Sequence, residues 1–253
     1  MRQLLLPGRL AVGQRIAVRD ADYHYLIRVR RHAVDDELEV VDEYRNRATV
    51  RIISVDDTSA DLQVLSLVDG PGDFTEIVVY QALPKGRKFD DVIRVLVQAG
   101  VHHLVPVETE RTVVRITDLG NNRMERWDRI AREAVQQSGS DPVSIASPVP
   151  LADAIREAGG DSGVHATCSL FLHTEPLAQA SLHGYLGTAV SRLVLFVGPE
   201  GGFSPAECDQ FIAAGVQPLW LGPRVYRTEV AGLAAVAAAQ LLLVESEEWQ
   251  LMK

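Results

Sequence analysis

A glycine-rich segment with a carboxylate in its middle is the first candidate site. Residues 197–207 read VGPEGGFSPAE and directly follow the apolar run LVLF. Glycines after a buried strand let the backbone approach a ligand closely. A phosphate-binding loop would need a Lys-Ser or Lys-Thr pair, which is absent, and would not suit the charge of Glu200. The segment therefore predicts a ligand other than a bare phosphate.

A second candidate loop follows about twenty residues later. At 219–229 the sequence reads LWLGPRVYRTE, in which Gly222 and Pro223 end a predicted strand. Two arginines come next, and Thr228 can cap a following helix with Glu229 in its first turn. In open α/β sheets, ligands bind at the carboxyl ends of the strands. Two glycine loops at that edge predict a site that wraps one small molecule.

The pattern around these loops predicts the elements that must position them. Three short β-rich runs lie between residues 38 and 68, and the breaker cluster DGPGD at 69–73 follows. We therefore predict a small β-barrel-like domain over 1–72 and an α/β domain with a mostly parallel sheet over 73–253. In that second domain, strands are predicted at 76–83, 101–107, 167–172, 193–197 and 216–221, and helices at 86–99, 123–137, 150–158, 204–214 and 228–244.

Composition limits the class of protein. The net charge is −9, but residues 1–140 hold 20 Lys and Arg against 22 Asp and Glu, so this part is nearly neutral and an RNA partner remains open. The two cysteines, Cys168 and Cys208, have no metal-ligand spacing around them, which argues against a metal site and favours a reducing compartment. The apolar stretches are too short for a signal peptide or a membrane span. We expect a soluble cytoplasmic protein without metal.

Several motifs together resemble one family. They are GPEGGFS at 198–204, LGPRVYRTE at 221–229, LPKG at 83–86, AGV at 99–101, ER at 110–111, RWDRIAREA at 126–134 and HYLIRV at 24–29. This combination spans most of the chain and is similar to the ribosomal RNA small subunit methyltransferase E family of the SPOUT superfamily.

The resemblance implies a fold and an activity. It implies a PUA-like β-barrel that helps to hold RNA, over 1–72, and a SPOUT-type α/β domain, over 73–253, with a C-terminal trefoil knot within about 167–240. It further implies a homodimer that uses S-adenosyl-L-methionine to methylate N3 of one uridine in 16S ribosomal RNA of the small subunit.

The resemblance also implies roles for individual residues. The expected cofactor-binding residues lie in the glycine loops and at the end of strand 167–172: Leu172, His173, Gly198, Pro199, Glu200, Gly201, Gly202, Leu221, Gly222, Val225, Tyr226, Arg227 and Thr228. Arg224 and Arg227 suit the negative charge that grows on the uracil oxygens. The imide proton needs an acceptor, for which Glu229, Glu200 and a water molecule are alternatives. Phosphate binding or an ion pair with Glu229 would also explain the arginines, and helix-dipole compensation would explain Glu229.

Candidate RNA contacts are basic residues of both domains: Arg9, Arg28, Arg30, Arg31, Lys85, Arg87, Lys88 and Arg111. The run Lys85-Gly86-Arg87-Lys88 lies at a predicted helix start, where cations oppose the helix dipole, and this position indicates a use other than local stability. For any one of these residues, a solvated surface charge is the alternative.

Three departures from the family pattern keep other functions open. Gln136 stands where the family has glutamate, Ser140 where it has arginine, and Tyr226 where it has leucine. The alternatives are a SPOUT methyltransferase acting on another RNA, at a base or a ribose 2′-O, and a non-catalytic RNA-binding assembly factor.

Overall fold

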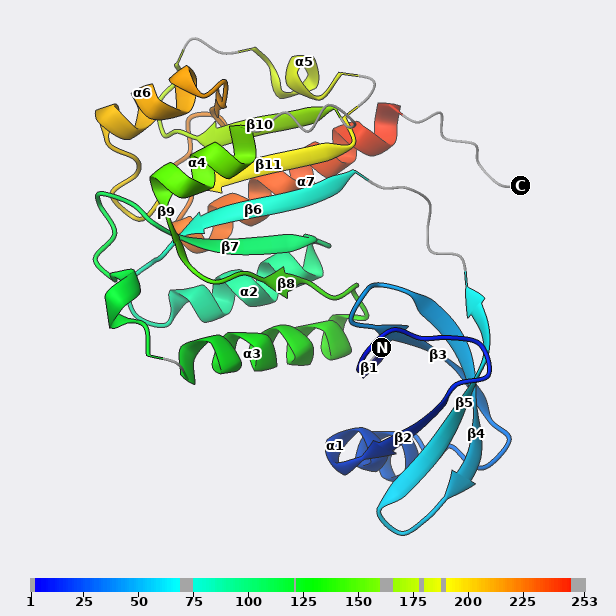
Figure 1. Ribbon diagram of the computed structural model, residues 1–253. Coiled ribbons are helices and arrows are strands. Elements are labelled where there is room, and N and C mark those ends of the chain that lie inside the picture. Colours follow the sequence, from blue (N-terminus) through cyan, green and yellow to red (C-terminus); the bar gives the residue numbers. More distant parts are fainter. Residues whose placement is uncertain are drawn as a thin grey trace. The chain divides into compact units, whose positions relative to one another are not determined.

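The computed structural model describes residues 3–68, 75–120, 122–159, 166–177, 180–187 and 190–246. The chain divides into two compact units, the first made of Met1–Asp73 and Val135–Pro142 and the second of Phe74–Ala134 and Val143–Lys253 (Figure 1). The breaker cluster at 69–73, which the sequence marks as a domain boundary, lies outside the described residues. Among the described helices, none combines the length and the apolar character needed to cross a membrane.

The first unit is built on a five-stranded sheet in the order β1-β3-β4-β5-β2. Its strands are β1 (Leu4–Leu6), β2 (Arg15–Arg19), β3 (Glu37–Asp42), β4 (Arg47–Val55) and β5 (Ser59–Val68). The strands β3, β4 and β5 confirm the three predicted β-rich runs. In β4 and β5, buried residues such as Val50, Ile52, Leu62 and Val64 alternate with less buried ones, which is the pattern of a sheet with one face on a core.

A short helical segment follows β2 and was not predicted. It consists of α1 (Asp20–Tyr23) and a π-helical stretch, His24–Val29, and it buries Tyr23 and Leu26 in the core of the first unit. Ten residues with only two buried side chains give too weak a periodicity to indicate a helix in the sequence.

The second unit contains a parallel sheet in the order β12-β10-β11-β6-β7-β8, and β9 also pairs with β7. Its strands are β6 (Glu76–Ala82), β7 (His103–Glu108), β8 (Ser144–Ile145), β9 (Val149–Pro150), β10 (Thr167–Leu172), β11 (Arg192–Val197) and β12 (Gln217–Leu219). Every pairing in this sheet is parallel, which confirms the predicted sheet type. Because the strands are parallel, their carboxyl ends meet at one edge.

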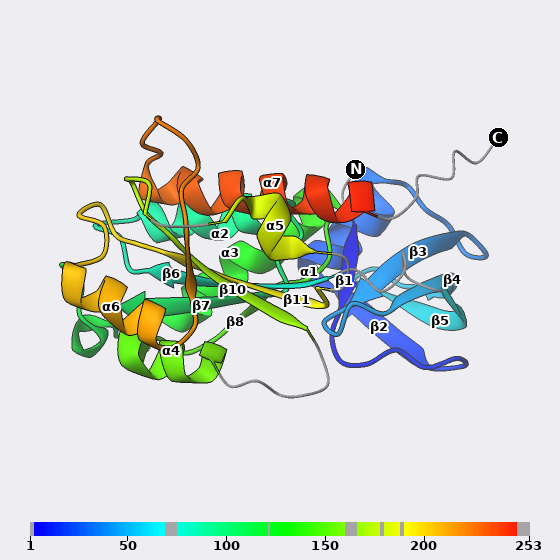
Figure 2. The same cartoon turned by 90° about the horizontal axis from the view of Figure 1, so that it is seen from above.

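Helices cover both faces of this sheet. They are α2 (Lys88–Gln98), α3 (Asn122–Ser138), α4 (Leu151–Gly159), α5 (Leu182–Leu186), α6 (Pro205–Ala213) and α7 (Thr228–Ser246). Figure 2 shows α2 and α7 on one face and α4 and α6 on the other. Two covered faces explain why β6 has a continuous apolar run over Ile77–Tyr80 and β11 has one over Leu193–Val197.

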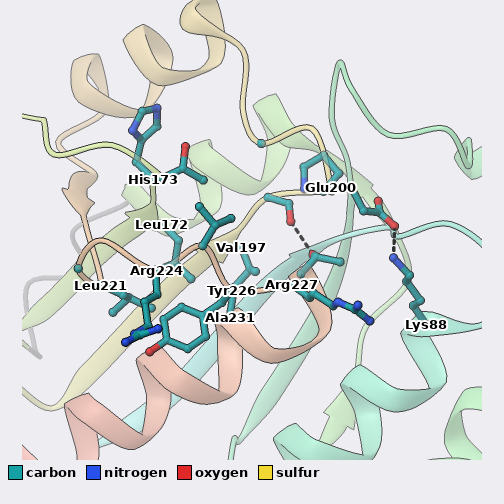
Figure 3. Close-up of a pocket in the computed structure, with 17 residues that line it drawn as sticks. Lys88, Leu172, His173, Val197, Glu200, Leu221, Arg224, Tyr226, Arg227 and Ala231 are labelled. Atoms are coloured by element: carbon teal, nitrogen blue, oxygen red, sulfur yellow. Dashed lines mark hydrogen bonds and ion pairs between the residues drawn. The ribbon is translucent and has the colours of Figure 1, made fainter.

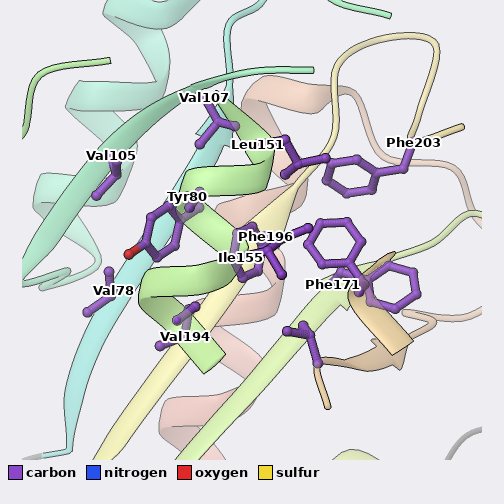
Figure 4. Packing of buried hydrophobic residues seen from close by; sticks show 14 of the residues in the cluster. Val78, Tyr80, Val105, Val107, Leu151, Ile155, Phe171, Val194, Phe196 and Phe203 are labelled. Carbon is purple, nitrogen blue, oxygen red and sulfur yellow. The ribbon is translucent and has the colours of Figure 1, made fainter. Parts of the chain in front are cut away.

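Aromatic side chains fill the face that carries α4 and α6 (Figure 4). Tyr80 stacks on Phe196 with ring centroids 4.6 Å apart, and Phe171 stacks on Phe211 at 4.7 Å. Phe203, directly after the glycine loop of 198–202, packs edge-on against Phe211 at 4.8 Å. The core therefore anchors the far end of this glycine loop.

Short elements and element ends differ from the predictions. The strand predicted at 216–221 ends at Leu219, so Trp220 and Leu221 belong to the loop. The helix predicted from 86 begins at Lys88, because Gly86 has a positive φ of 68° that no helix accommodates. The two-residue strands β8 and β9 and the five-residue α5 were missed, since none is long enough to show a period.

Candidate functional site

A pocket of about 340 Å³ lies at the carboxyl edge of the parallel sheet (Figure 3). The ends of β10 and β11, the loop before α7 and the first turn of α7 line it. Every residue that the sequence predicts for cofactor binding lines this pocket except Gly201. Arg224, predicted for catalysis, also lines it, whereas Glu229 does not. The structure thus brings the two glycine loops together around one cavity.

Thr228 joins the two loops. Its hydroxyl donates a hydrogen bond to the carbonyl oxygen of Gly198 at 2.7 Å and accepts one from Gln81 Nε2 at 3.0 Å. Thr228 is buried, and so is Gln81, which lies on β6. Buried hydrogen bonds of this kind are costly to break, so the start of α7 is fixed against the first loop.

The first loop needs its glycines. A Cβ atom at Gly198 would lie 3.3 Å from Cα of Gly202, which is closer than ordinary contacts permit. Gly202 itself has φ of 65°, and Gly222 in the second loop has φ of 99°. Both loops therefore follow a backbone path that depends on glycine.

An ion pair between Lys88 and Glu200 lies along one wall of the pocket. Lys88 Nζ donates to Glu200 Oε1 at 2.8 Å, and the backbone N–H of Lys85 donates to the same oxygen at 3.3 Å. Partial burial acts to raise the pKa of Glu200, but these hydrogen bonds outweigh burial, and the pKa lies below its ordinary value. The hydrogen bond to Glu200 in turn raises the pKa of Lys88. Glu200 is therefore ionised and held in place.

Glu229 has a different environment. Its Oε2 atom lies 3.9 Å from Lys88 Nζ, is buried and accepts no hydrogen bond from the described residues. The sequence left open an ion pair between Glu229 and Arg224 or Arg227. In the structure Lys88 is the cation near Glu229, so that alternative is wrong. Glu229 thus keeps a buried acceptor atom that no described residue uses.

The loop before α7 exposes its side chains. Arg224, Tyr226 and Arg227 are exposed, and Val225 is 75% exposed. Figure 3 places Arg224 beside Tyr226 on one side of the pocket and Arg227 toward Lys88 on the other. Among the described residues, neither guanidinium has an ion-pair partner. Both arginines can therefore bind an anionic or carbonyl-bearing group that enters from solvent.

Arg111 holds the first loop from outside the pocket. Its Nη1 donates to the carbonyl oxygens of Gly201 at 2.7 Å and Phe203 at 3.2 Å. The preceding backbone N–H, of Glu110, donates to Glu207 Oε1 at 2.7 Å, and Glu207 also completes the capping box of α6 with Ser204. These contacts give Arg111 a structural use within the second unit, next to its predicted role in RNA binding.

The other residues predicted to contact RNA lie on the surface. Lys85 and Arg87 are exposed at the start of α2, while Lys88 is half-buried in the pocket wall. In the first unit, Arg28 lies over the ring of Tyr23 and Arg9 over the ring of Tyr44, and Arg30 and Arg31 are exposed.

Four lining residues were not predicted for the pocket: Lys88, Thr174, Val197 and Ala231. Ala231 lies one helical turn after Thr228, and Val197 is the last residue of β11, so both positions follow from the elements. The position of Lys88 indicates a special use, because a cation at a helix start opposes the helix dipole. The sequence could not show that the charge of Lys88 is neutralised by Glu200.

Comparisons with known proteins define the class to which this fold and site belong. The model of the RNA methyltransferase domain family matches residues 72–240.

Among the described residues, no three His, Cys, Asp or Glu side chains form a group that could hold a metal ion.

Relatives of known name narrow the class to one family. Ribosomal RNA small subunit methyltransferase E of Synechocystis sp. is 30% identical over 95% of this chain and 78% of its own length, and that of Bacillus subtilis is 27% identical over 86% of each. The crystal structure of the Neisseria gonorrhoeae enzyme of the same name, bound to S-adenosyl methionine, superposes with a TM-score of 0.78 at 27% identity, over 96% of this chain and 98% of that one. The chain belongs to the ribosomal RNA small subunit methyltransferase E family.

Proposed function

We propose that this protein transfers a methyl group from S-adenosyl-L-methionine to N3 of one uridine in 16S ribosomal RNA of the small subunit, in the cytoplasm. The observation that carries this proposal is the meeting of loops 198–202 and 221–228 at one pocket, in a chain whose gonococcal relative was solved with S-adenosyl methionine.

The pocket suits this cofactor on its own chemistry. Leu172, Val197, Leu221 and Ala231 supply apolar surface for an adenine ring, and the glycine loops supply backbone donors and acceptors. A Cβ atom at Gly198 would press on the Gly202 backbone at 3.3 Å, so the loop would have to shift to accept a side chain there. The cofactor, when bound, supplies an electrophilic methyl group on a sulfonium cation. The acidic wall at Glu200 is compatible with that cation or with a ribose hydroxyl.

The chain's own residues must orient the uracil and manage its charge. We assign Arg224 and Arg227 to the uracil oxygens, because both line the pocket, face solvent and lack ion-pair partners among the described residues. Loss of the N3 proton leaves negative charge on those oxygens, which two guanidinium groups can stabilise. Holding N3 about 3 Å from the methyl carbon is mainly an effect of orientation.

We assign the proton acceptor to Glu229 rather than Glu200. Glu200 is ionised, but Lys88 and the Lys85 amide both donate to its Oε1 atom, and its pKa is lowered, which weakens it as a base. The Oε2 atom of Glu229 is buried, accepts no hydrogen bond from the described residues and lies 3.9 Å from Lys88 Nζ. Since Glu229 does not line the pocket, its side chain must turn toward the substrate or act through a water molecule.

The finer features of the fold belong to the same proposal. We assign residues 1–72 to a PUA-like β-barrel that holds RNA, in support of which the first unit has a five-stranded sheet and exposed Arg9, Arg28, Arg30 and Arg31. We assign residues 167–240 to a trefoil knot. In support, the chain leaves β10 for β11 and then returns past β10 to β12, before the second loop packs against the first.

The departures from the family pattern are compatible with activity. Gln136 Nε2 donates to Asp22 Oδ1 at 2.9 Å within the first unit. A glutamate at 136 would set a second carboxylate against Asp22, so glutamine suits this partner. Tyr226 lines the pocket beside Arg224, where it adds apolar surface. Ser140 lies in the first unit, away from the pocket residues along the chain.

A homodimer is the expected assembly, and α7 offers the surface for it. Val230 and Leu241 are 41% and 59% exposed, Ala237 is exposed, and Ala234 and Val244 are half-buried. Their spacing of four and three residues is that of a helix–helix packing seam. We expect Leu241→Glu to convert the dimer to a monomer in light scattering, while the exposed apolar control Leu67→Glu, on β5, does not.

The test of cofactor and substrate is methyl transfer from tritiated S-adenosyl-L-methionine to small ribosomal subunits that lack their uridine N3 methylation. We expect the wild type to label 16S rRNA and Arg227→Ala to fail. Calorimetric titration of the cofactor should give one site per chain, weakened in Gly198→Val. If the wild type neither binds the cofactor nor labels 16S rRNA, the proposed function is refuted.

A further inference from the structure

Tyr44 presents an aromatic ring to solvent at the turn between β3 and β4. It is 64% exposed, although aromatic residues contribute most when they are buried. A single exposed apolar residue needs no explanation by itself. The structure around Tyr44 provides two further observations, one on the turn and one on its neighbour Arg9.

The turn that carries Tyr44 is held by a buried carboxylate. Asp42 is fully buried, and its Oδ1 accepts hydrogen bonds from the backbone N–H groups of Tyr44 at 2.8 Å and Asn46 at 2.9 Å. Its Oδ2 accepts from Asn46 Nδ2 at 2.8 Å and from the backbone N–H of Leu10 at 2.9 Å. Arg45 adopts φ of 68°, so the turn bends sharply just after Tyr44. The ring is therefore displayed by a rigid turn.

Arg9 lies over this ring. Its Cζ atom is 5.9 Å from the centroid of Tyr44, within the range of a cation–π contact. The segment that carries Arg9 is tied to the same turn, because Gly8 N–H donates to Glu43 Oε2 at 3.0 Å and Leu10 N–H donates to Asp42. Two separate segments of the chain thus hold a cation over an aromatic ring at the surface.

We propose that Tyr44 and Arg9 form a stacking platform for an unpaired base of single-stranded RNA. The proposal rests on the proposed function for the identity of that RNA. Proteins recognise unpaired RNA bases by stacking them on aromatic rings and guanidinium planes, and a neighbouring cation neutralises phosphate. Because the turn is already ordered by Asp42, binding a base there requires little further ordering of the protein.

RNA fits this surface better than a protein partner does. The platform combines one π face with one positive charge, which matches the stacked base and phosphate of a nucleotide. A protein interface would need a larger apolar centre, whereas the residues next to Tyr44 are the charged Glu43 and Arg45.

The test measures binding of the full-length protein to a fluorescent single-stranded oligonucleotide that carries 2-aminopurine, at several salt concentrations. We expect Tyr44→Ala to weaken the affinity roughly 5- to 150-fold, to abolish quenching of 2-aminopurine and to leave the salt dependence unchanged. Tyr44→Phe should bind as the wild type does. Arg9→Gln should reduce the slope of log K against log salt by about 0.7.

Matched controls use the same unit of the protein. Val12→Ala removes an equally exposed apolar residue, and Arg15→Gln removes an exposed cation of β2. The proposal is overturned if Tyr44→Ala binds RNA as tightly as the wild type, or no more weakly than Val12→Ala. Methyl transfer by the same wild-type preparation separates the two claims. If the wild type transfers the methyl group but Tyr44→Ala binds RNA normally, only the stacking platform is refuted. If Tyr44→Ala weakens RNA binding but the wild type transfers no methyl group, only the proposed function is refuted.

Discussion

Arg111 Nη1 donates a hydrogen bond to the carbonyl oxygen of Gly201 at 2.7 Å, across ninety positions of sequence. The stem of the arginine also lies over Gly201, since a Cβ atom there would be 3.5 Å from Arg111 Cδ. Arg111 thus holds the glycine loop at Gly201, while Thr228 holds it at Gly198. Arg111, which the sequence predicts to contact RNA, thus holds the loop that also carries the pocket residues Glu200 and Gly202.

We predict that Arg111→Lys weakens cofactor binding. The Gly201 and Phe203 carbonyl oxygens both accept from the same atom, Nη1, and the lysine side chain keeps the charge but is one bond too short to place its nitrogen there. We expect the dissociation constant for S-adenosyl-L-methionine to rise about 10-fold, or ~1.4 kcal/mol, in calorimetry. Arg115→Lys, at a partly exposed ion pair with Glu108, is the control and should bind as the wild type does. If Arg111→Lys binds the cofactor normally but loses RNA affinity, Arg111 acts on RNA instead.

Two glycines of the second unit should respond in opposite ways to alanine. Gly198→Ala brings a methyl group within 3.3 Å of the Gly202 backbone, so the loop must shift and cofactor affinity should fall. Gly232 lies inside α7, where a Cβ atom would meet its neighbours at 3.5 Å or more, an ordinary contact. Gly232→Ala should therefore raise the free energy of unfolding by up to about 1 kcal/mol. Thermal unfolding and cofactor titration of both variants check this contrast.

The two carboxylates at the site should differ in catalysis. We predict that Glu229→Gln lowers kcat about 100-fold or more without a large change in the dissociation constant of the cofactor, as expected for loss of a general base. Glu200→Gln should mainly weaken cofactor binding, because it breaks the ion pair with Lys88. Single-turnover kinetics and calorimetry separate the two effects. An unchanged single-turnover rate in Glu229→Gln would show that another group accepts the proton.

Alkaline pH should destabilise the protein through Tyr80. Burial, followed by the nearby charge of Glu157, raises the pKa of Tyr80 to about 12 from an ordinary value near 10. The hydroxyl is neutral in both states below pH 10. As pH rises from 10 to 12, the unfolded state loses the proton first, so the free energy of unfolding falls by up to about 1.4 kcal/mol per pH unit. Urea denaturation between pH 8 and 11.5 measures this fall, which Tyr80→Phe should reduce and Tyr44→Phe, at an exposed ring, should not.

The long elements of the second unit could be predicted from sequence because their apolar patterns are strong. β10 lies at the predicted residues 167–172, and α7 begins at the predicted Thr228. The two glycine loops were also recognisable, since a strand end followed by Gly-Pro has few structural uses. Their convergence on one pocket required the strand order, which the sequence does not encode locally.

Side-chain partners were the part that the sequence could not predict. The sequence predicts that Lys88 contacts RNA, whereas the structure pairs it with Glu200 in the pocket wall. This ion pair could not be predicted, because Glu200 is far away along the chain. Arg111 is likewise predicted to contact RNA, and its hydrogen bond to the distant Gly201 could not be predicted. The short α1 and its π-helical continuation were missed because so few buried residues define them. In each case tertiary contacts, rather than local propensity, decide the outcome.

The central claim is tested most directly by the identity of the methylated nucleoside. Small ribosomal subunits lacking their uridine N3 methylation should be incubated with the protein and S-adenosyl-L-methionine, and their 16S rRNA digested to nucleosides for mass spectrometry. The account predicts 3-methyluridine at a single site. A methylated nucleoside of another kind, or none from a protein that binds the cofactor, would contradict it.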